Sequence, residues 1–220
     1  MTWFPWITAS TSGRASARVD AARAATSAVH ATAIRAALAE HAQRQGTERS
    51  LLSYEEAVAL VCQATGWPVG HVWEPGPEGW RSAGAWYDAG PEFADLKAST
   101  AATDLGSGRG IVAAVLHLEA SRILPGLAGL GSTVRERDAT ALGLTTVVGV
   151  PLRRGGTIEA VFEFVTSSHV EAQDDLADAL LAVAAVARRR VPTATDADPT
   201  QAAARKTVLL DIAIPIDLAG

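Results

Sequence analysis

The stretch from Cys62 to Trp73, CQATGWPVGHVW, is where the sequence changes from a helical pattern to a strand pattern. An amphipathic run ends at Thr65-Gly66, and glycine commonly follows the last turn of a helix. Trp67-Pro68 then indicates a turn, and the β-branched and aromatic residues after Gly70 are typical of a strand. The stretch therefore predicts a helix that leads directly into a β-strand.

Helical and strand patterns alternate along the rest of the chain. Ser53 and Glu56 have the spacing of a capping box, in which each side chain bonds the backbone N–H of the other residue. Composition, amphipathic spacing and Gly or Pro punctuation predict helices at 14–45, 53–66, 91–102, 111–119, 133–142 and 172–190. Strands are expected at 69–73, 80–87, 145–152 and 157–166, and residues 122–131 are expected to be irregular. The predicted fold class is α+β, with a central antiparallel β-sheet, flanking helices and a preceding Ala-rich helix.

Taken in order, five segments resemble the GAF family. They are the opening stretch, WRSAGAWY (80–87), LGSGRGI (105–111), ATALGLTTVVGVPL (139–152) and GGTIEAVFEFV (155–165). The resemblance covers residues 51–190 and implies a GAF-like fold. GAF domains are small-molecule sensing and dimerisation modules of bacterial signalling proteins. The resemblance therefore implies a small-molecule ligand, a ligand cavity lined on one side by helix 133–142, and a homodimer formed through the flanking helices.

Composition and the resemblance together predict four segments. Residues 1–50 hold an apolar tag, TWFPWI, and the Ala-rich helix; residues 51–191 form the GAF-like domain. Residues 192–206 are a linker by composition, and residues 207–220 form an apolar C-terminal motif. Pro215 bars that motif from a central strand, so it is either a docking peptide for a protein partner or an edge strand. Its docking residues are expected to be Ile212, Ile214, Ile216 and Leu218.

Five residues are candidates for ligand binding. His71 lies on a predicted strand and either contacts a ligand or is a buried histidine that bonds the backbone. Trp73 and Trp86, with Trp80, lie on neighbouring strands, where they pack across the sheet or line a flat cavity for a ring-shaped ligand. Arg109 lies between glycines and either joins an anion site or belongs to an ordinary turn. Arg135 pairs with a ligand or with a neighbouring side chain.

Several residue patterns of known enzymes are missing. Cys62 is the single cysteine, and the GAF-fold methionine sulfoxide reductases need a second thiol for disulfide exchange. The chain has no GxSxG motif and no Cys/His spacing typical of zinc. Glu159 and Glu163 share a strand face and are interpreted as an exposed stripe, and Cys62 as a small core residue. We therefore predict no catalytic and no metal-binding residue, and the sequence identifies no cofactor.

Charge and hydropathy limit the classes of partner that the protein can bind. The net charge is −5, although six arginines and only three acidic residues precede residue 51. The acidic remainder is a poor match for a nucleic-acid backbone. No apolar run approaches the roughly 20 residues needed to span a bilayer, and the N-terminus lacks the basic start of a signal peptide. A cytoplasmic protein that binds neither nucleic acid nor membrane is expected.

The predicted function is a small-molecule-sensing regulatory GAF-domain protein without its own catalytic output, acting through a partner or by dimerisation. The alternative is an adaptor or cargo-type module that docks to a larger assembly through its C-terminal motif.

Overall fold

The computed structural model describes residues 11–45, 51–106 and 109–189, with side chains from Val19 onward. The predicted apolar tag, the linker and the C-terminal motif with Ile212, Ile214, Ile216 and Leu218 lie outside the described residues.

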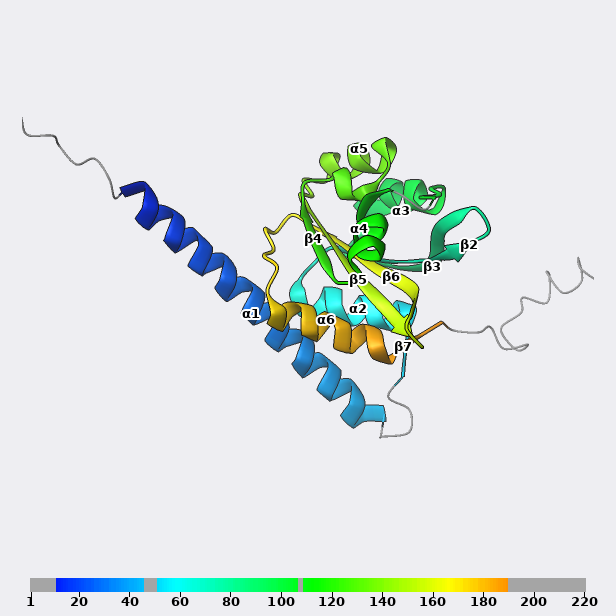
Figure 1. Cartoon of the computed structure of the whole chain (residues 1–220), viewed down its shortest axis with the longest axis horizontal. Helices are drawn as coiled ribbons and strands as arrows, with labels where there is room; N and C mark the ends of the chain where they lie inside the picture. Colours follow the sequence, from blue (N-terminus) through cyan, green and yellow to red (C-terminus); the bar gives the residue numbers. More distant parts are fainter. Residues whose placement is uncertain (1–10, 46–50, 107–108, 190–220) are drawn as a thin grey trace, which may run out of the picture. The chain divides into compact units, whose positions relative to one another are not determined.

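A five-stranded sheet forms the centre of the described domain (Figure 1). Every neighbouring pair of strands is antiparallel, in the order β3-β2-β6-β5-β4. The strands are β2 (Val69–Gly76), β3 (Gly79–Asp88), β4 (Arg122–Pro125), β5 (Thr146–Arg154) and β6 (Thr157–Thr166). A separate parallel pair joins β1 (Leu52–Ser53) to β7 (Ala187–Arg188). The predicted α+β class with a central antiparallel sheet is confirmed.

The segment that was expected to be irregular contains the edge strand β4. Its four residues pair with β5, from Arg122 opposite Gly149 to Pro125 opposite Thr146. A run this short shows no periodicity in the sequence, so only its pairing with β5 defines it as a strand.

The helix-to-strand prediction from the opening stretch is confirmed. Helix α2 (Tyr54–Thr65) begins with the capping box of Ser53 and Glu56 and ends at Gly66, whose φ is 71°. The chain then enters β2, where a Cβ on Gly70 would lie 2.8 Å from Cys62 Sγ. A glycine at this position therefore allows α2 to pack directly on the strand that follows it.

Helices cover both faces of the sheet. One face, which we call the α2/α6 face, is covered by α1 (Thr11–Gln45), α2 and α6 (Asp174–Val186). The other, the α4/α5 face, is covered by α3 (Ala94–Ala101), α4 (Gly110–Leu118) and α5 (Thr133–Ala141). Two short 3-10 turns, η1 (Pro91–Phe93) and η2 (Ala128–Leu130), also contribute to the α4/α5 face.

The central strand β6 supplies side chains to both layers. Phe162 and Phe164 point into the α2/α6 face, and Val161 and Val165 into the α4/α5 face, because successive side chains of a strand point to opposite faces. Ile158, which by this alternation would share a face with Phe162 and Phe164, instead packs against the α4/α5 face. The register between β5 and β6 shifts between Leu152 and Arg153, which reverses the side on which Ile158 lies.

The leading helix α1 lies along α6 and α2, as Figure 1 shows. Its inner side buries Ser27, Ala31 and Ile34. Its outer side includes Val29, whose side chain is 66% exposed. Within the described part of the chain, no helix combines the length and apolarity needed to cross a membrane.

Candidate functional site

A buried ion pair lies at the centre of the α4/α5 face. Arg135 of α5 and Glu163 of β6 are almost fully buried, at 1% and 0% exposure. The guanidinium bonds both carboxylate oxygens, with Nη1 3.5 Å from Oε1 and Nη2 in close contact with Oε2. Its Nε donates to Thr100 Oγ1 at 2.9 Å and its Nη1 to the Leu130 carbonyl at 2.6 Å. The arginine is therefore held from three sides, by α3, by η2 and by the sheet.

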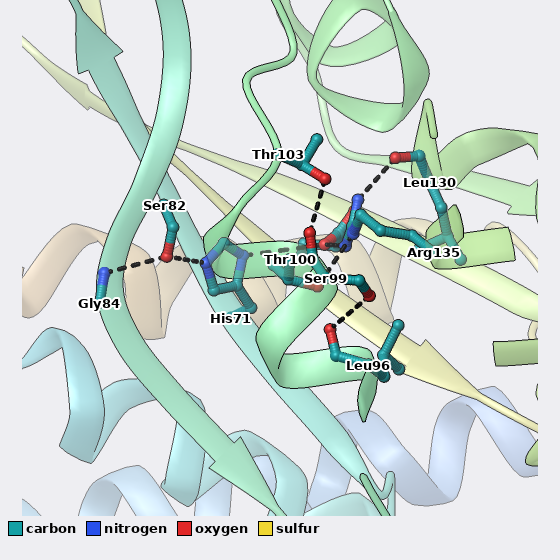
Figure 2. A network of polar contacts seen from close by, with 10 residues as sticks. His71, Ser82, Gly84, Leu96, Ser99, Thr100, Thr103, Leu130 and Arg135 are labelled. Carbon is teal, nitrogen blue, oxygen red and sulfur yellow. Dashed lines mark hydrogen bonds and ion pairs between the residues drawn. The ribbon is translucent and has the colours of Figure 1, made fainter. Parts of the chain in front are cut away.

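His71 extends this network toward the edge strand β3 (Figure 2). Its Nε2 lies 2.8 Å from Ser82 Oγ, which also accepts a bond from the Gly84 N–H at 3.2 Å. Its Nδ1 has no hydrogen-bond partner and lies 3.8 Å from Glu163 Oε2. A carboxylate at this position favours the tautomer with the proton on Nδ1, so Nε2 accepts the hydrogen of the Ser82 hydroxyl.

The charges in the network are fixed by their surroundings. Burial lowers the pKa of His71; Glu163 opposes this effect and Arg135 adds to it. Burial by itself would raise the pKa of Glu163, but the positive charge of Arg135 and the nearby His71 ring hold that pKa below its ordinary value. The site therefore contains a neutral imidazole beside a charge-neutral ion pair.

The imidazole of His71 lies between two of the predicted ligand-binding tryptophans. Its ring centre is 4.7 Å from that of Trp73, edge-on, and 5.5 Å from that of Trp86. The Arg135 guanidinium lies over Trp73 at 5.0 Å, a cation–π contact. The space between these two rings, where the sequence suggested a flat aromatic cavity, is thus filled by a side chain of the protein itself.

Four of the five predicted ligand residues come together here, namely His71, Trp73, Trp86 and Arg135. Arg109 does not join them. It lies at the start of α4 and lines a separate polar groove with Gly131, Ser132 and Glu136. The glycines around Arg109 predicted a local turn, but its distance from the other candidates depends on tertiary structure.

The interpretation of Glu159 and Glu163 as one exposed stripe is wrong for Glu163. Glu159 is partly exposed and pairs with Arg154 Nε at 2.6 Å, whereas Glu163 has no exposed surface. Ser82 and Thr100 also belong to the site, although neither is among the candidates that the sequence offers. The signal for Glu163 was its place between Phe162 and Phe164 in a strand that is apolar on both sides.

A serine–histidine–carboxylate chain is also the arrangement by which hydrolases activate serine. Here the carboxylate is neutralised by Arg135 and lies 3.8 Å from the imidazole. This geometry suits a structural network better than a nucleophile. Cys62 is a buried core residue, and burial raises the pKa of its thiol. Among the described residues, no group of three or more His, Cys, Asp or Glu side chains is placed to hold a metal ion.

No family model matches the sequence, and no curated protein matches it. Solved structures do resemble the fold. The free methionine-R-sulfoxide reductase of Neisseria meningitidis, in complex with its substrate, is 14% identical with a TM-score of 0.49, over 73% of this chain and 86% of that chain. The GAF domain of A. aeolicus Nlh2, in an inactive state, is 15% identical with a TM-score of 0.48, over 70% and 93%. The GAF domain of an Acinetobacter phosphoenolpyruvate-protein phosphotransferase is 15% identical with a TM-score of 0.46, over 70% and 87%.

The fold predicted from the five sequence segments and the fold found in the structure are the same. The antiparallel sheet carries α1, α2 and α6 on one face and α3, α4 and α5 on the other. The described residues of this chain form a GAF-like α+β domain.

Proposed function

We propose that the protein is a cytoplasmic regulatory module of the GAF type, which responds to a small molecule and acts through a second copy of itself rather than by catalysis. The observation that carries this proposal is the outer surface of α1. A sensing role fits the GAF-like fold and the absence of an activated nucleophile among the described residues of the Ser82–His71–Glu163 network.

The outer surface of α1 carries a stripe of uncharged, mostly small residues. They recur every three or four positions on the side away from the sheet, and Val29 is the most exposed of the large apolar residues in the described part of the chain. A shallow apolar groove follows the middle of the stripe. We define the stripe as Ala22, Ala25, Val29, Thr32, Ala33 and Ala36.

Small side chains let the backbones of two packed helices approach each other closely. The stripe holds no charge that would have to be desolvated in a dimer, whereas the neighbouring positions Arg23 and Arg35 are bonded to Glu171 and Asp175 of their own domain. One side of α1 is thus bonded to its own domain, and the stripe on the opposite side remains exposed for contact with a second copy.

The oligomeric state in solution tests the proposal. We expect a homodimer for the natural chain by sedimentation equilibrium and a monomer for Val29→Arg, because the arginine places a charge in the centre of the stripe. Ala42→Arg is the matched control, since Ala42 is exposed but lies about 140° around the helix axis from Val29. A natural chain that stays monomeric at every concentration, or a Val29→Arg dimer, would contradict the proposal.

The C-terminal motif is a separate proposal, which the alternation of Ile212, Ile214, Ile216 and Leu218 supports. As a docking peptide it would bind a larger protein assembly. Removal of residues 207–220 should then abolish co-purification of that partner and leave the α1-mediated dimer intact.

A further inference from the structure

A cavity of about 380 Å³ opens on the α2/α6 face, at the end of the sheet where β4 and β5 meet α6. Its volume falls in the range of small-molecule sites, about 300–1,000 Å³. The floor is apolar and comes from both the sheet and the helix. It includes Ile123, Val148, Leu176, Leu180 and Leu181.

Two polar groups in the lining lack a partner among the described residues, Ser121 Oγ and Arg122 Nε. Ser121 Oγ is buried and makes no hydrogen bond within the described residues. A buried polar atom without a partner destabilises the structure, because it has lost its hydrogen bonds to water without replacing them. A ligand that brings a hydrogen-bonding group to Ser121 would remove this penalty while its body covers the apolar floor.

The charges around the cavity are balanced. Glu119 is bridged to Arg153, whose Nη2 lies 2.8 Å from Glu119 Oε2 and whose Nη1 donates to the Glu119 carbonyl at 3.0 Å. Asp174 and Arg122 also line the site. Two acidic and two basic residues leave no net charge, so the unpartnered Arg122 N–H favours a ligand that offers a neutral hydrogen-bond acceptor.

We propose that this cavity binds an uncharged small molecule with an aromatic or branched aliphatic body and one hydroxyl or carbonyl group, which bonds Ser121 Oγ and accepts a hydrogen bond from Arg122 Nε. We further propose that the bound molecule alters the attachment of α1. This second step rests on the proposed function, whereas binding itself does not.

The route from the cavity to α1 is short. Gln173 and Asp174 line the cavity, and their neighbours Glu171 and Asp175 hold α1. Ser27 Oγ donates to the Glu171 carbonyl at 3.2 Å, and Arg35 Nη2 donates to the Asp175 carbonyl at 2.9 Å. A ligand that shifts the first turn of α6 must therefore move the acceptors on which α1 depends. Such a ligand biases α1 to the extent that it binds the two arrangements with different affinity.

The binding test uses para-propylphenol as the probe and para-propylbenzoate as its charged counterpart, with saturation-transfer NMR on the full chain. We expect the phenol to bind more tightly than the benzoate. Ala177→Phe should abolish phenol binding because Ala177 lines the cavity, and Ala182→Phe, on the exposed side of α6, should leave it unchanged. Ser121→Ala should weaken it about two- to twelve-fold, the range of one neutral hydrogen bond.

A position measurement on the natural chain makes the result independent of whether Ala177→Phe folds. Intermolecular NOEs from the phenol to the methyl groups of Ile123 and Leu180 are expected. No phenol binding, NOEs to other methyl groups only, or tighter binding of the benzoate would each overturn the site.

The coupling test is hydrogen exchange of α1 amides with and without saturating phenol. We expect exchange between Ser27 and Arg35 to change in the natural chain and in Ala182→Phe. Bound phenol with unchanged exchange in α1 would overturn the coupling alone. A monomeric natural chain that still binds phenol in the cavity would overturn the proposed function and leave the site standing.

Discussion

The two faces of the sheet are closed in different ways, although neighbouring residues of the same strands supply both. On β6, Phe162 and Phe164 enter an apolar layer on the α2/α6 face, and Glu163 between them enters a charged network on the α4/α5 face. The apolar layer leaves a cavity of about 380 Å³ beside α6. Around Glu163, in contrast, the Arg135 guanidinium and the rings of His71, Trp73 and Trp86 contact one another.

This difference follows from the kind of interaction on each face. Apolar contacts are non-directional, so a layer built from them tolerates a void at its margin at the cost of some dispersion energy. A buried ion pair depends on the positions of a few atoms, and it is favourable only when its donors and acceptors are satisfied. The packing of the α4/α5 face therefore depends on the exact positions of the charged and hydrogen-bonding atoms around Glu163. The packing of the α2/α6 face depends mainly on how much apolar area it buries.

The largest expected effect is the loss of the charge pair. Arg135→Met leaves the Glu163 carboxylate buried without its cation, which should lower the free energy of unfolding by about 3–5 kcal/mol in urea denaturation. Arg137→Met, which removes the exposed neighbour that bonds Asp138, should change little.

A double substitution shows whether the pair serves stability or specificity. Arg135→Met with Glu163→Leu removes both charges and should recover much of the lost stability, because apolar replacements of buried pairs are often neutral. Recovery of none of it would mean that the pair itself, and not its imbalance, stabilises the face.

A loss of stability of intermediate size is expected when a side chain is enlarged in the core. The two faces of the sheet should tolerate such an enlargement differently. A Cβ on Gly149 would lie 2.4 Å from Ile111 Cγ1 and 2.8 Å from Val115 Cγ2. Gly149→Ala should therefore destabilise the α4/α5 face by about 1–3 kcal/mol. Ala177→Leu extends into the cavity on the α2/α6 face and should change stability by less than about 1 kcal/mol. Equal losses for the two variants, measured by urea denaturation, would remove the distinction between the faces.

The smallest effect is the pH dependence that comes from His71. Its pKa is lowered in the folded protein, so the unfolded chain binds the proton more readily. The stability contributed by neutral His71 is complete above the ordinary histidine pKa of about 6.5 and is lost as pH falls below it toward the folded pKa. Glu163, whose folded pKa is also lowered, adds a second loss below its unfolded pKa of about 4.3.

Urea denaturation at a series of pH values should show this as a decrease in stability between about pH 7 and about pH 5. The decrease should be smaller in His71→Gln. His30→Gln is the comparison, because burial also lowers the pKa of His30, on the α2/α6 face. If only His30→Gln flattened the profile, the apolar face and not the charged face would carry the pH dependence.

The parts of the fold that local sequence specifies could be predicted. The capping box at Ser53, the glycine after α2 and the alternation in β6 from Ala160 onward each act within a few residues, and each is found in the structure. The edge strand β4 was missed because four residues carry too little periodicity. The glycines around Arg109 indicate only a local turn. The packing of α4 against η2 separates Arg109 from the other candidates.

Glu163 was missed for a different reason. Alternation assigns a residue to a face, but it does not say whether that face is covered. Glu163 was correctly placed opposite Phe162 and Phe164, yet α3 and α5 bury its face through Thr100 and Arg135, which are 63 and 28 residues away along the chain. The Glu163 carboxylate can be buried in the centre of the sheet because Arg135, which is distant in the sequence, supplies its counter-charge.

The short parallel pair β1–β7 has a mechanical consequence. It places the residue at which the domain begins, Leu52, directly beside Ala187 near its end. Tension along the chain would pull these parallel strands in opposite directions along their axes. On the N-terminal side the pull would first have to separate α1 from α2 and α6, and only then would the load fall on the few hydrogen bonds between β1 and β7.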